Sequence, residues 1–462
     1  MPASSLTPST TAGRAAPNVL FIIADDHRHD ALGLCGHPAV RTPNLDALAA
    51  RGTRFSHAYH MGGLIAAVCS PARAALLTGR NAIAADAAPD PSSRPDRKVA
   101  LSAGSTTLPE LFRRAGYETF ITGKWHNDPA SLHRSFTGGH RIFLGGMCEH
   151  TRVPLHDFSP RGDYSAPPRF ESGFSTDLFC ESARDFLAGR RQPFFLYLSL
   201  TSPHDPRTPP PAFAGMYDPA HLPLPANFRP DHPFDNGELS IRDEMLAPRP
   251  LDPDVVRQQL AAYYGMISHH DAQLGRVFET LRTHQLEANT LVVYVSDHGL
   301  ALGSHGLLGK QNLYEPSVRV PLLLAGPGIA AGRTDARLVY SLDLYATLAQ
   351  LAGLQLPPGL DTVSLATPEH GGRETLFSLY KDCQRMVRDE RWKLIRYRVN
   401  GQERLQLFDL KKDPDELHDL AADSAYHEIV QRLLRAHAAW QDRMGDRWMP
   451  VASSHSGPAT TN

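Results

Sequence analysis

The chain has 462 residues, of which 42% are hydrophobic and 21% charged, an ordinary globular balance that suggests one large domain with a smaller one. Lysine and arginine number 47 against 49 aspartates and glutamates, and the resulting net charge of −2 argues against a nucleic-acid partner. No apolar run approaches the roughly 20 residues of a membrane span, and residues 1–16 lack the pattern of a secretory signal. The five cysteines are widely spaced, which argues against a disulfide framework or a structural zinc site. We therefore expect a cytoplasmic protein with no membrane partner.

Short apolar runs alternate with helical patterns along the chain, which is typical of a mostly parallel α/β sheet. Helices are expected from Thr42-Pro43 onward and over Thr107–Ala115, Val255–Leu281 and Asp343–Ala352. Two stretches, 127–175 and 203–253, are expected to be irregular loops that shape a pocket. The expected strands are Val19–Ala24, Thr119–Thr122, Phe194–Leu200, Leu291–Val295 and Leu322–Ala325.

The composition changes after about residue 370. Four short antiparallel strands and a terminal helix, Tyr426–Arg443, predict a smaller α+β domain that docks on the first. The strands are Thr375–Tyr380, Gln384–Arg388, Trp392–Tyr397 and Leu405–Leu410. We thus divide the chain into a disordered segment 1–16, a catalytic domain 17–370, a C-terminal subdomain 371–450 and a loose tail 451–462.

Four of the five apolar runs in the first part end in an unusual polar cluster. In open parallel sheets, ligands bind beyond the carboxyl ends of the strands, so these clusters would meet at one edge if the strands run the same way. The clusters are Asp25-Asp26, Gly123-Lys124-Trp125-His126, Ser202-Pro203-His204-Asp205 and Ser296-Asp297-His298-Gly299.

Asp25, Asp26 and Asp297 would repel one another at that edge unless a cation lay between them. Three carboxylates suit Ca²⁺ or Mg²⁺, whereas a nitrogen ligand from His298 shifts the preference toward Mn²⁺ or Zn²⁺. An Asp-Asp pair alone is more often a helix cap or a solvated turn. The matching Asp297-His298 after a second strand favours the metal site instead.

Cys69 begins the segment Cys69-Ser70-Pro71-Ala72-Arg73. Ser70 could cap, and Pro71 open, a helix that runs to Leu77, with Cys69 at its N-terminus. The helix terminus and Arg73 would both lower the pKa of the thiol. A lone cysteine is more often a small buried hydrophobe, but these neighbours are specific.

With these motifs the chain resembles the formylglycine-dependent (type I) sulfatases of the alkaline-phosphatase-like superfamily, including iduronate-sulfatase-like and choline-sulfatase-like members. The resemblance covers nearly all of residues 17–420, and Cys-x-Pro-x-Arg is the signal for oxidation of cysteine to formylglycine. It implies an α/β fold with a large mixed, mostly parallel sheet sandwiched by helices and a smaller C-terminal α+β domain. The resemblance also uses Thr42–Asp46, Leu77–Arg80, Pro203-His204, Trp392–Ile395 and Leu407–Leu410.

The resemblance also implies roles for individual residues. The metal ligands would be Asp25, Asp26, Asp297, His298 and modified Cys69, with Ca²⁺ favoured although many relatives have Asn where this chain has His298. Arg73 would hold the formylglycine hydrate, Lys124 and His126 would contact the sulfate and the hydrate, His204 would lie near the ester oxygen, and Lys310 would be a second sulfate-binding lysine.

These residue types match the chemistry of sulfate ester hydrolysis. A metal and two ammonium groups neutralise the sulfate, and one hydroxyl of the hydrate attacks sulfur. His204, with help from Lys310, would protonate the leaving alkoxide, and His126 would take the proton from the second hydroxyl as the sulfated hydrate collapses. The expected substrate is a small organic or saccharide sulfate, and maturation requires the formylglycine-generating enzyme as a partner.

Three other functions compete with this interpretation. The same fold could hydrolyse phosphonate or phosphate esters, or sulfamates, and a pseudo-enzyme with an unmodified Cys69 could merely bind metal. Trp125 is expected in the core, and His305 could line the pocket. Some polar residues of the loops should bind the non-sulfate half of the substrate; the candidates are His133, Arg134, His140, Glu149, His150, His156, Asp157, Arg207 and Asp235.

Overall fold

The computed structural model describes residues 16–89, 97–367 and 372–448. The predictions of a disordered segment at 1–16 and a loose tail at 451–462 therefore lie, apart from Ala16, outside the described residues. The boundaries drawn between domains stay predictions.

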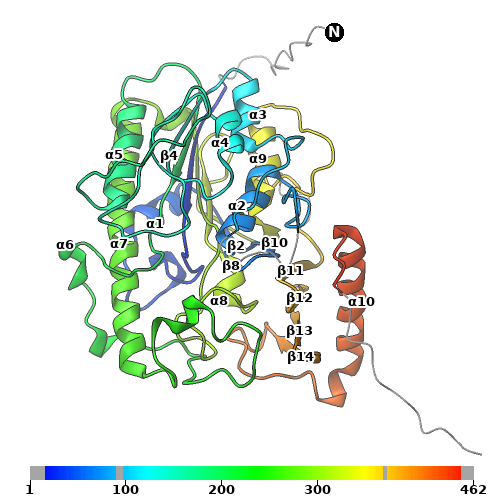
Figure 1. Cartoon of the computed structure of the whole chain (residues 1–462). Coiled ribbons are helices and arrows are strands. Elements are labelled where there is room, and N and C mark those ends of the chain that lie inside the picture. The colour runs from blue at the N-terminus through cyan, green and yellow to red at the C-terminus, as the bar shows by residue number, and fades with distance from the viewer. Residues whose placement is uncertain (1–15, 90–96, 368–371, 449–462) are drawn as a thin grey trace, which may run out of the picture.

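A large mixed sheet forms the centre of the molecule (Figure 1), as the sequence predicts. The strand order is β10-β2-β9-β7-β1-β6-β4-β5, with β8 paired to β2. The neighbours from β7 to β5 in this order are parallel, whereas β9 is antiparallel to both β7 and β2. The bounds are β1 Asn18–Ala24, β2 Gly52–Tyr59, β4 Glu118–Lys124, β5 Gly138–Phe143, β6 Phe194–Ser199, β7 Thr290–Ser296, β8 Arg319–Val320, β9 Leu322–Ala325 and β10 Arg333–Tyr340.

Helices cover both faces of this sheet (Figure 1). The bounds of the α-helices are α1 Pro43–Ala50, α2 Cys69–Thr78, α3 Leu108–Arg114, α4 Pro129–Ser135, α5 Ser175–Leu187, α6 Pro211–Ala214, α7 Pro253–Thr283, α8 Glu315–Val318, α9 Leu344–Leu351 and α10 His427–Met444. Short 3₁₀ turns are η1 Gly33–Cys35, η2 Pro219–His221, η3 Arg242–Leu246, η4 Glu287–Asn289, η5 Ser341–Asp343 and η6 Ser424–Tyr426.

Strand β1 shows why the sheet is buried on both sides. Val19, Phe21 and Ile23 belong to a core shared with α2, α3 and α9, while the alternate residues Leu20 and Ile22 belong to a core shared with α1, α5 and α7. All of these side chains are fully buried, and each contributes about 1.5–3 kcal/mol of hydrophobic stabilisation. The continuous apolar run of β1 is therefore the pattern of a doubly covered parallel strand.

Local details of the helices and loops partly differ from the predictions. The stretch 127–175 is not entirely irregular, because it contains α4 and the edge strand β5. Helix α1 begins at Thr42-Pro43 as predicted, with Thr42 as the N-cap residue, but the Thr42 hydroxyl donates to Asp46 and accepts from the backbone N–H of Gly33 instead of capping the helix. The capping box at the start of α3, by contrast, is complete, with Thr107 accepting from the Glu110 N–H.

A second, smaller sheet and α10 form the C-terminal part, which confirms the predicted α+β arrangement. Its order is β14-β13-β12-β11-β3, and β3 (Gly62–Gly63) comes from the first part of the chain. This pairing of β3 with β11 was not predicted, because a strand of two glycines has no apolar pattern. The other bounds are β11 Leu376–Tyr380, β12 Gln384–Arg388, β13 Trp392–Val399 and β14 Gln402–Asp409.

Candidate active site

The four polar clusters meet at one edge of the large sheet. Strands β7, β1, β6 and β4 are parallel neighbours, and their registers pair Ala24 with Ser296, Ile23 with Ser199 and Gly123 with Ser199. The residues that follow these strand ends are consequently held side by side by the backbone ladder.

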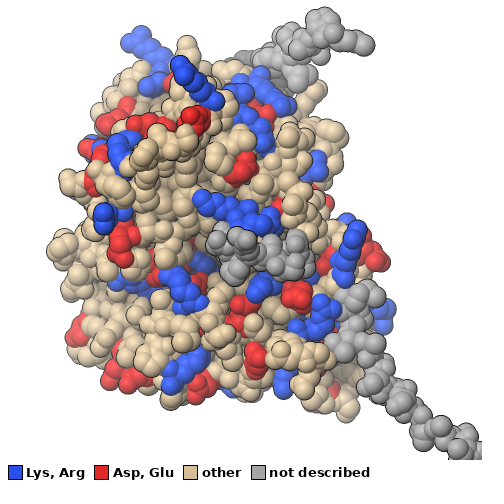
Figure 2. All heavy atoms as spheres, in the orientation of Figure 1, with Lys and Arg blue, Asp and Glu red and all other residues tan. Residues whose placement is uncertain are grey.

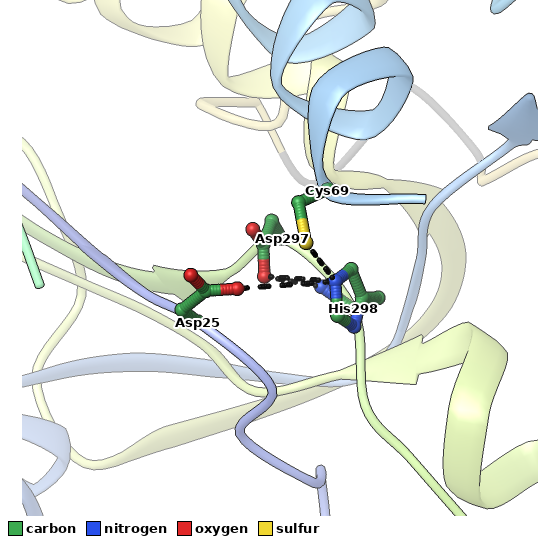
Figure 3. A group of neighbouring side chains, drawn as sticks. All are labelled: Asp25, Cys69, Asp297 and His298. Atoms are coloured by element: carbon green, nitrogen blue, oxygen red, sulfur yellow. Dashed lines mark hydrogen bonds and ion pairs between the residues drawn. The ribbon is translucent and has the colours of Figure 1, made fainter. Parts of the chain in front are cut away.

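Asp25, Cys69, Asp297 and His298 point toward one another at this edge (Figure 3). One ligand atom from each of the four lies within 4.8 Å of the others, and Asp25, Asp26, Cys69 and His204 form an overlapping group by the same measure. All of these residues are buried. The cluster unites β1, β7 and α2, which are far apart in the sequence.

Hydrogen bonds fix the orientation of His298 and Asp297. His298 Nδ1 lies 2.9 Å from the carbonyl oxygen of Gly299, so its Nε2 faces the Cys69 Sγ at 3.0 Å. One Asp297 oxygen accepts from the backbone N–H of His298, and the other accepts from Arg73 Nε at 2.8 Å. Oδ1 of Asp25 is buried and has no hydrogen-bond partner in the described part of the chain.

The turn after β1 is held by contacts that the sequence did not predict. Asp26 has a φ of 68°, in the left-handed region that a non-glycine residue adopts only when its surroundings enforce it. Tyr263 on α7 donates to the Asp26 carbonyl at 2.7 Å, and the His27 N–H donates to Ser296 Oγ at 2.9 Å. These partners depend on tertiary packing, so no local motif could reveal them.

Cys69 is the first residue of α2, as expected, but the cap differs from the prediction. Val68 is the N-cap residue without a side-chain bond, and Ser70 instead accepts from the Val99 N–H and donates to the His126 carbonyl. The predicted lowering of the Cys69 pKa was also wrong. Burial and the nearby Asp25 carboxylate raise the pKa of this thiol, and Lys124 and Lys310 do not outweigh them.

Two buried basic side chains, Lys124 and Arg73, form ion pairs with the carboxylates of the cluster. Lys124 Nζ pairs with Asp25 and donates to the Gly146 carbonyl at 2.6 Å, while Arg73 also donates to Ser199 Oγ at 2.7 Å. Burial and Asp297 work against ionisation of Asp25, but Lys124, His204 and Arg73 lower its pKa to about 2. Asp25 is therefore a carboxylate at neutral pH.

Lys310 and His204 form a second pair beside Cys69. Lys310 Nζ lies 2.9 Å from Asp26 Oδ1, 2.9 Å from His204 Nε2 and 3.5 Å from Cys69 Sγ. His204 Nδ1 lies 2.7 Å from the Asp205 carbonyl, so Nδ1 is the donor there, and Nε2 faces the lysine ammonium and Cys69. Burial disfavours a proton on His204, but Asp26 raises its pKa to about 9, and the pair stays protonated at neutral pH.

His126 has the opposite character. Burial, followed by the charges of Lys124 and Arg73, holds its pKa well below the usual value, so the imidazole is neutral. Its Nδ1 is buried with no hydrogen-bond partner among the described residues. The site thus combines a protonated pair on one side with a neutral base on the other. Trp125, next to it, is fully buried as expected.

A cavity of about 390 Å³ opens over Cys69. None of the nine loop residues proposed from sequence lines it within the described ranges, and neither does His305, which stacks on Tyr314. His150, for example, bonds Ser175 and the His204 carbonyl instead. The lining residues are Ala66, Ala67, Cys69, Lys98, His126, Gly146, Met147, His204, Ile241, Arg242, Asp243, Lys310 and Gln311.

Comparison with protein families gives the site its context. Residues 17–354 match the sulfatase family, and residues 303–442 match the C-terminal region of N-sulphoglucosamine sulphohydrolase. The chain belongs to the sulfatase family. It is a sulfuric ester hydrolase, which confirms the predicted enzyme class.

Relatives named as sulfatases agree with this assignment, and solved structures share the fold. The chain is 29% identical to a choline-sulfatase of Rhizobium meliloti, over 96% of this chain and 92% of the relative, and 28% identical to an arylsulfatase of Clostridium perfringens, over 90% and 92%. It also resembles in fold a protein solved with its substrate D-glucosamine-2-N,6-O-disulfate, with a TM-score of 0.78 and 23% identity over 94% of this chain and 99% of the other. A phosphonate monoester hydrolase of Agrobacterium radiobacter shares the fold, with a TM-score of 0.73 and 24% identity over 93% and 96%.

Among the described residues, no helix is both long and apolar enough to cross a membrane. The expected cytoplasmic location stays a prediction.

Proposed function

We propose that this chain releases inorganic sulfate from a small organic or saccharide sulfate ester by means of a formylglycine at position 69 and one divalent cation. The observation that carries the proposal is the meeting of Asp25, Cys69, Asp297 and His298 within 4.8 Å beneath a cavity lined by Lys310, His126 and His204. Family membership supports the sulfate ester, and the geometry supports the residue roles.

The residues present fit a divalent cation. Asp25, Asp26, Asp297 and His298 would hold it, because the buried Asp25 oxygen without a partner and the mutually close carboxylates need a positive charge. A thiolate is a soft ligand that suits Ca²⁺ poorly, whereas the oxygen of a formylglycine hydrate is hard. Oxidation of Cys69 would thus complete an oxygen-rich set, for which we favour Ca²⁺ over Mg²⁺ or Mn²⁺. The bound cation would polarise the sulfate oxygens.

The modified residue would supply a hydroxyl nucleophile that an unmodified thiol cannot match, since the pKa of Cys69 is raised. Arg73 lies one turn along α2 and is fixed by Asp297 and Ser199, so it would orient the hydrate. Lys124, at the end of β4, and Lys310, in the loop between β7 and α8, both lie near Cys69 and would bind the sulfate oxygens. The Cys69-x-Pro71-x-Arg73 signal makes the formylglycine-generating enzyme the maturation partner.

Proton transfer would use the two groups of opposite character. The protonated Lys310–His204 pair would supply the proton to the leaving alkoxide oxygen, with the Asp205 carbonyl fixing the His204 ring. His126, neutral and with a free ring nitrogen, would accept the proton that restores the aldehyde. The assignment of acid and base follows from the pKa directions, because the Lys310–His204 pair holds a proton at neutral pH and His126 does not.

The substrate class follows from the cavity and the relatives. A cavity of about 390 Å³ has room for a monosaccharide or a small alcohol beside the sulfate. Relatives named for small or saccharide substrates include the choline-sulfatase and an N-acetylglucosamine-6-O-sulfatase of Bacteroides thetaiotaomicron, 25% identical over 93% of this chain and 88% of the relative.

The test is a comparison of steady-state rates on phenyl sulfate and phenylphosphonate, using enzyme co-produced with a formylglycine-generating enzyme. The proposal predicts sulfate release that depends on a divalent cation and a kcat/KM for the sulfate at least about tenfold above that for the phosphonate. Faster phosphonate hydrolysis, or equal turnover by Cys69→Ala, would contradict it.

A further inference from the structure

The cations around the cavity are matched with carboxylates, with one exception. Arg242 Nη1 and Nη2 lie 2.8 and 2.9 Å from the two Asp205 oxygens, and Arg242 also contacts Asp243. Lys310 pairs with Asp26, just as Lys124 pairs with Asp25 below the cavity. Arg242 is thus matched by two carboxylates, and the two lysines are those proposed to bind the scissile sulfate, so none of the three is left for a second anion.

Lys98 is the exception. Its Nζ donates to the carbonyl oxygen of Leu144 at 2.6 Å, and no carboxylate of the described residues lies in ion-pair range. One carbonyl leaves two of the three ammonium protons without a protein partner among those residues. The side chain is exposed on the cavity wall, so an incoming molecule can reach it.

Two electrostatic observations place this ammonium in the field of the site. Burial and repulsion from Lys124 lower the pKa of Lys98, and Lys98 in turn helps to lower the pKa of His126. The positive charge of Lys98 therefore acts on Lys124 and His126, which are proposed to bind the sulfate and to accept a proton. An anion placed against Lys98 would relieve this repulsion.

We propose that Lys98 forms a binding subsite for a second anionic group, a carboxylate or a second sulfate, on the alcohol half of the substrate. The proposal rests on the proposed function, because the scissile sulfate must occupy the site over Cys69. A singly charged sulfate ester leaves Lys98 without a carboxylate or sulfate partner among the described residues and the ligand, whereas a doubly charged one supplies that partner. The subsite would thus select dianionic substrates from neutral-tailed ones.

The overall charge of the molecule gives little general attraction for anions. On the face that Figure 2 shows, basic and acidic side chains are interspersed, which fits the overall net charge of −2. A general attraction for anions is therefore weak, and selection must come from a local contact. Lys98 is the cavity-lining residue placed to make it.

The first experiment compares 3- and 4-carboxyphenyl sulfate with the neutral isosteres 3- and 4-carbamoylphenyl sulfate. We expect wild-type enzyme to prefer a carboxylate, and Lys98→Met to lower the ratio of the two kcat/KM values by about five- to tenfold, mostly through KM. Lys98→Arg should keep most of the preference and Lys98→Glu should reverse it. Lys411→Met, which removes an exposed lysine of the C-terminal part, is the matched control and should leave the ratio unchanged.

The second experiment separates this subsite from turnover. Calorimetric binding of the same four esters to the full-length Cys69→Ser protein, with and without Lys98→Met, measures affinity without chemistry. A carboxylate preference that disappears with Lys98→Met supports the subsite even if wild-type enzyme releases no sulfate, in which case the proposed function alone fails. Equal ratios in wild type and Lys98→Met, or no carboxylate preference in either assay, overturn the subsite.

Discussion

The floor and the wall of the cavity are built in different ways. The floor consists of buried residues that follow parallel strands or begin a helix, namely Asp25, Lys124, Asp297 and Cys69. The wall includes Lys98 and Met147, which lie in loops, and Arg242, which begins the short 3₁₀ turn η3. The floor is buried and densely charged, while Lys98, Met147 and Arg242 of the wall are exposed. We infer that the floor performs the chemistry and that the wall selects the substrate.

The largest expected loss of activity follows from substitution of Cys69 in the floor, and this substitution tests whether the floor performs the chemistry. Cys69→Ala should lower kcat on an aryl sulfate by at least about 10³-fold, because it removes the proposed nucleophile from the carboxylate cluster. The thermal midpoint should stay within a few degrees, since a small buried side chain is replaced by a smaller one. Steady-state kinetics with melting of the same sample checks both. Near wild-type turnover in a folded Cys69→Ala variant would refute the assigned nucleophile.

Removal of the metal should come next in size. Dialysis against a chelator should lower kcat by about 10²–10³-fold, and it should lower the thermal midpoint because an ion that binds only the folded state stabilises that state. Added Ca²⁺ should restore both quantities. If activity and midpoint stayed unchanged after exhaustive chelation, confirmed by elemental analysis, the floor would hold no exchangeable divalent cation.

Removing one cation from the floor should cost more activity than removing one cation from the wall, and Lys124 and Arg242 allow this comparison. Lys124→Ala should lower kcat/KM on phenyl sulfate by about 10²-fold, because a buried ammonium would be lost from the sulfate and Asp25 left without its partner. Arg242→Ala, which removes a cation from the wall, should cost about tenfold or less. Comparable losses in the two variants would mean that the division between floor and wall is wrong.

The residues that could be predicted from sequence are those of the floor. A strand end has a fixed place in a parallel sheet, so Asp25, Lys124 and Asp297 were identifiable once β1, β4 and β7 were recognised as apolar runs. The wall could not be predicted, because the course of a long loop depends on packing that leaves no periodic signal. Lys98 and Met147 therefore went unnoticed, while histidines such as His150 drew attention and proved to bond within the protein. Sheet strands β2 and β10 were missed for a related reason, since polar residues interrupt their apolar pattern.

The buried histidines near the floor predict how stability depends on pH. Burial lowers the pKa of His27 to about 4 and that of His150 to about 4, so both are neutral in the folded protein and take up protons on unfolding. Above the unfolded pKa of about 6.5 these two histidines do not affect the free energy of unfolding. As the pH falls from 6.5 toward 4, that free energy decreases by about 3 kcal/mol for each group. Urea unfolding between pH 7.5 and 4.5 measures this slope. His150→Gln should flatten it, and an unchanged slope would contradict the assignment.

The smallest expected effect is at the wall. Met147→Ala should raise KM for an aryl sulfate about threefold and leave kcat within twofold, because Met147 lines the cavity without touching the reacting groups. Michaelis–Menten analysis measures both constants. The matched control is Met216→Ala, because Met216 is an exposed methionine outside the cavity lining. A large fall in kcat for Met147→Ala would place the wall in the chemistry.

The most direct test of the whole account is the mass of the tryptic peptide that contains Cys69, measured on preparations of different specific activity. Conversion to formylglycine makes this peptide about 18 Da lighter than the unmodified one. The account predicts that sulfate release rises in proportion to the converted fraction and vanishes when that fraction is zero. Full activity in a preparation whose Cys69 is entirely a thiol would contradict it.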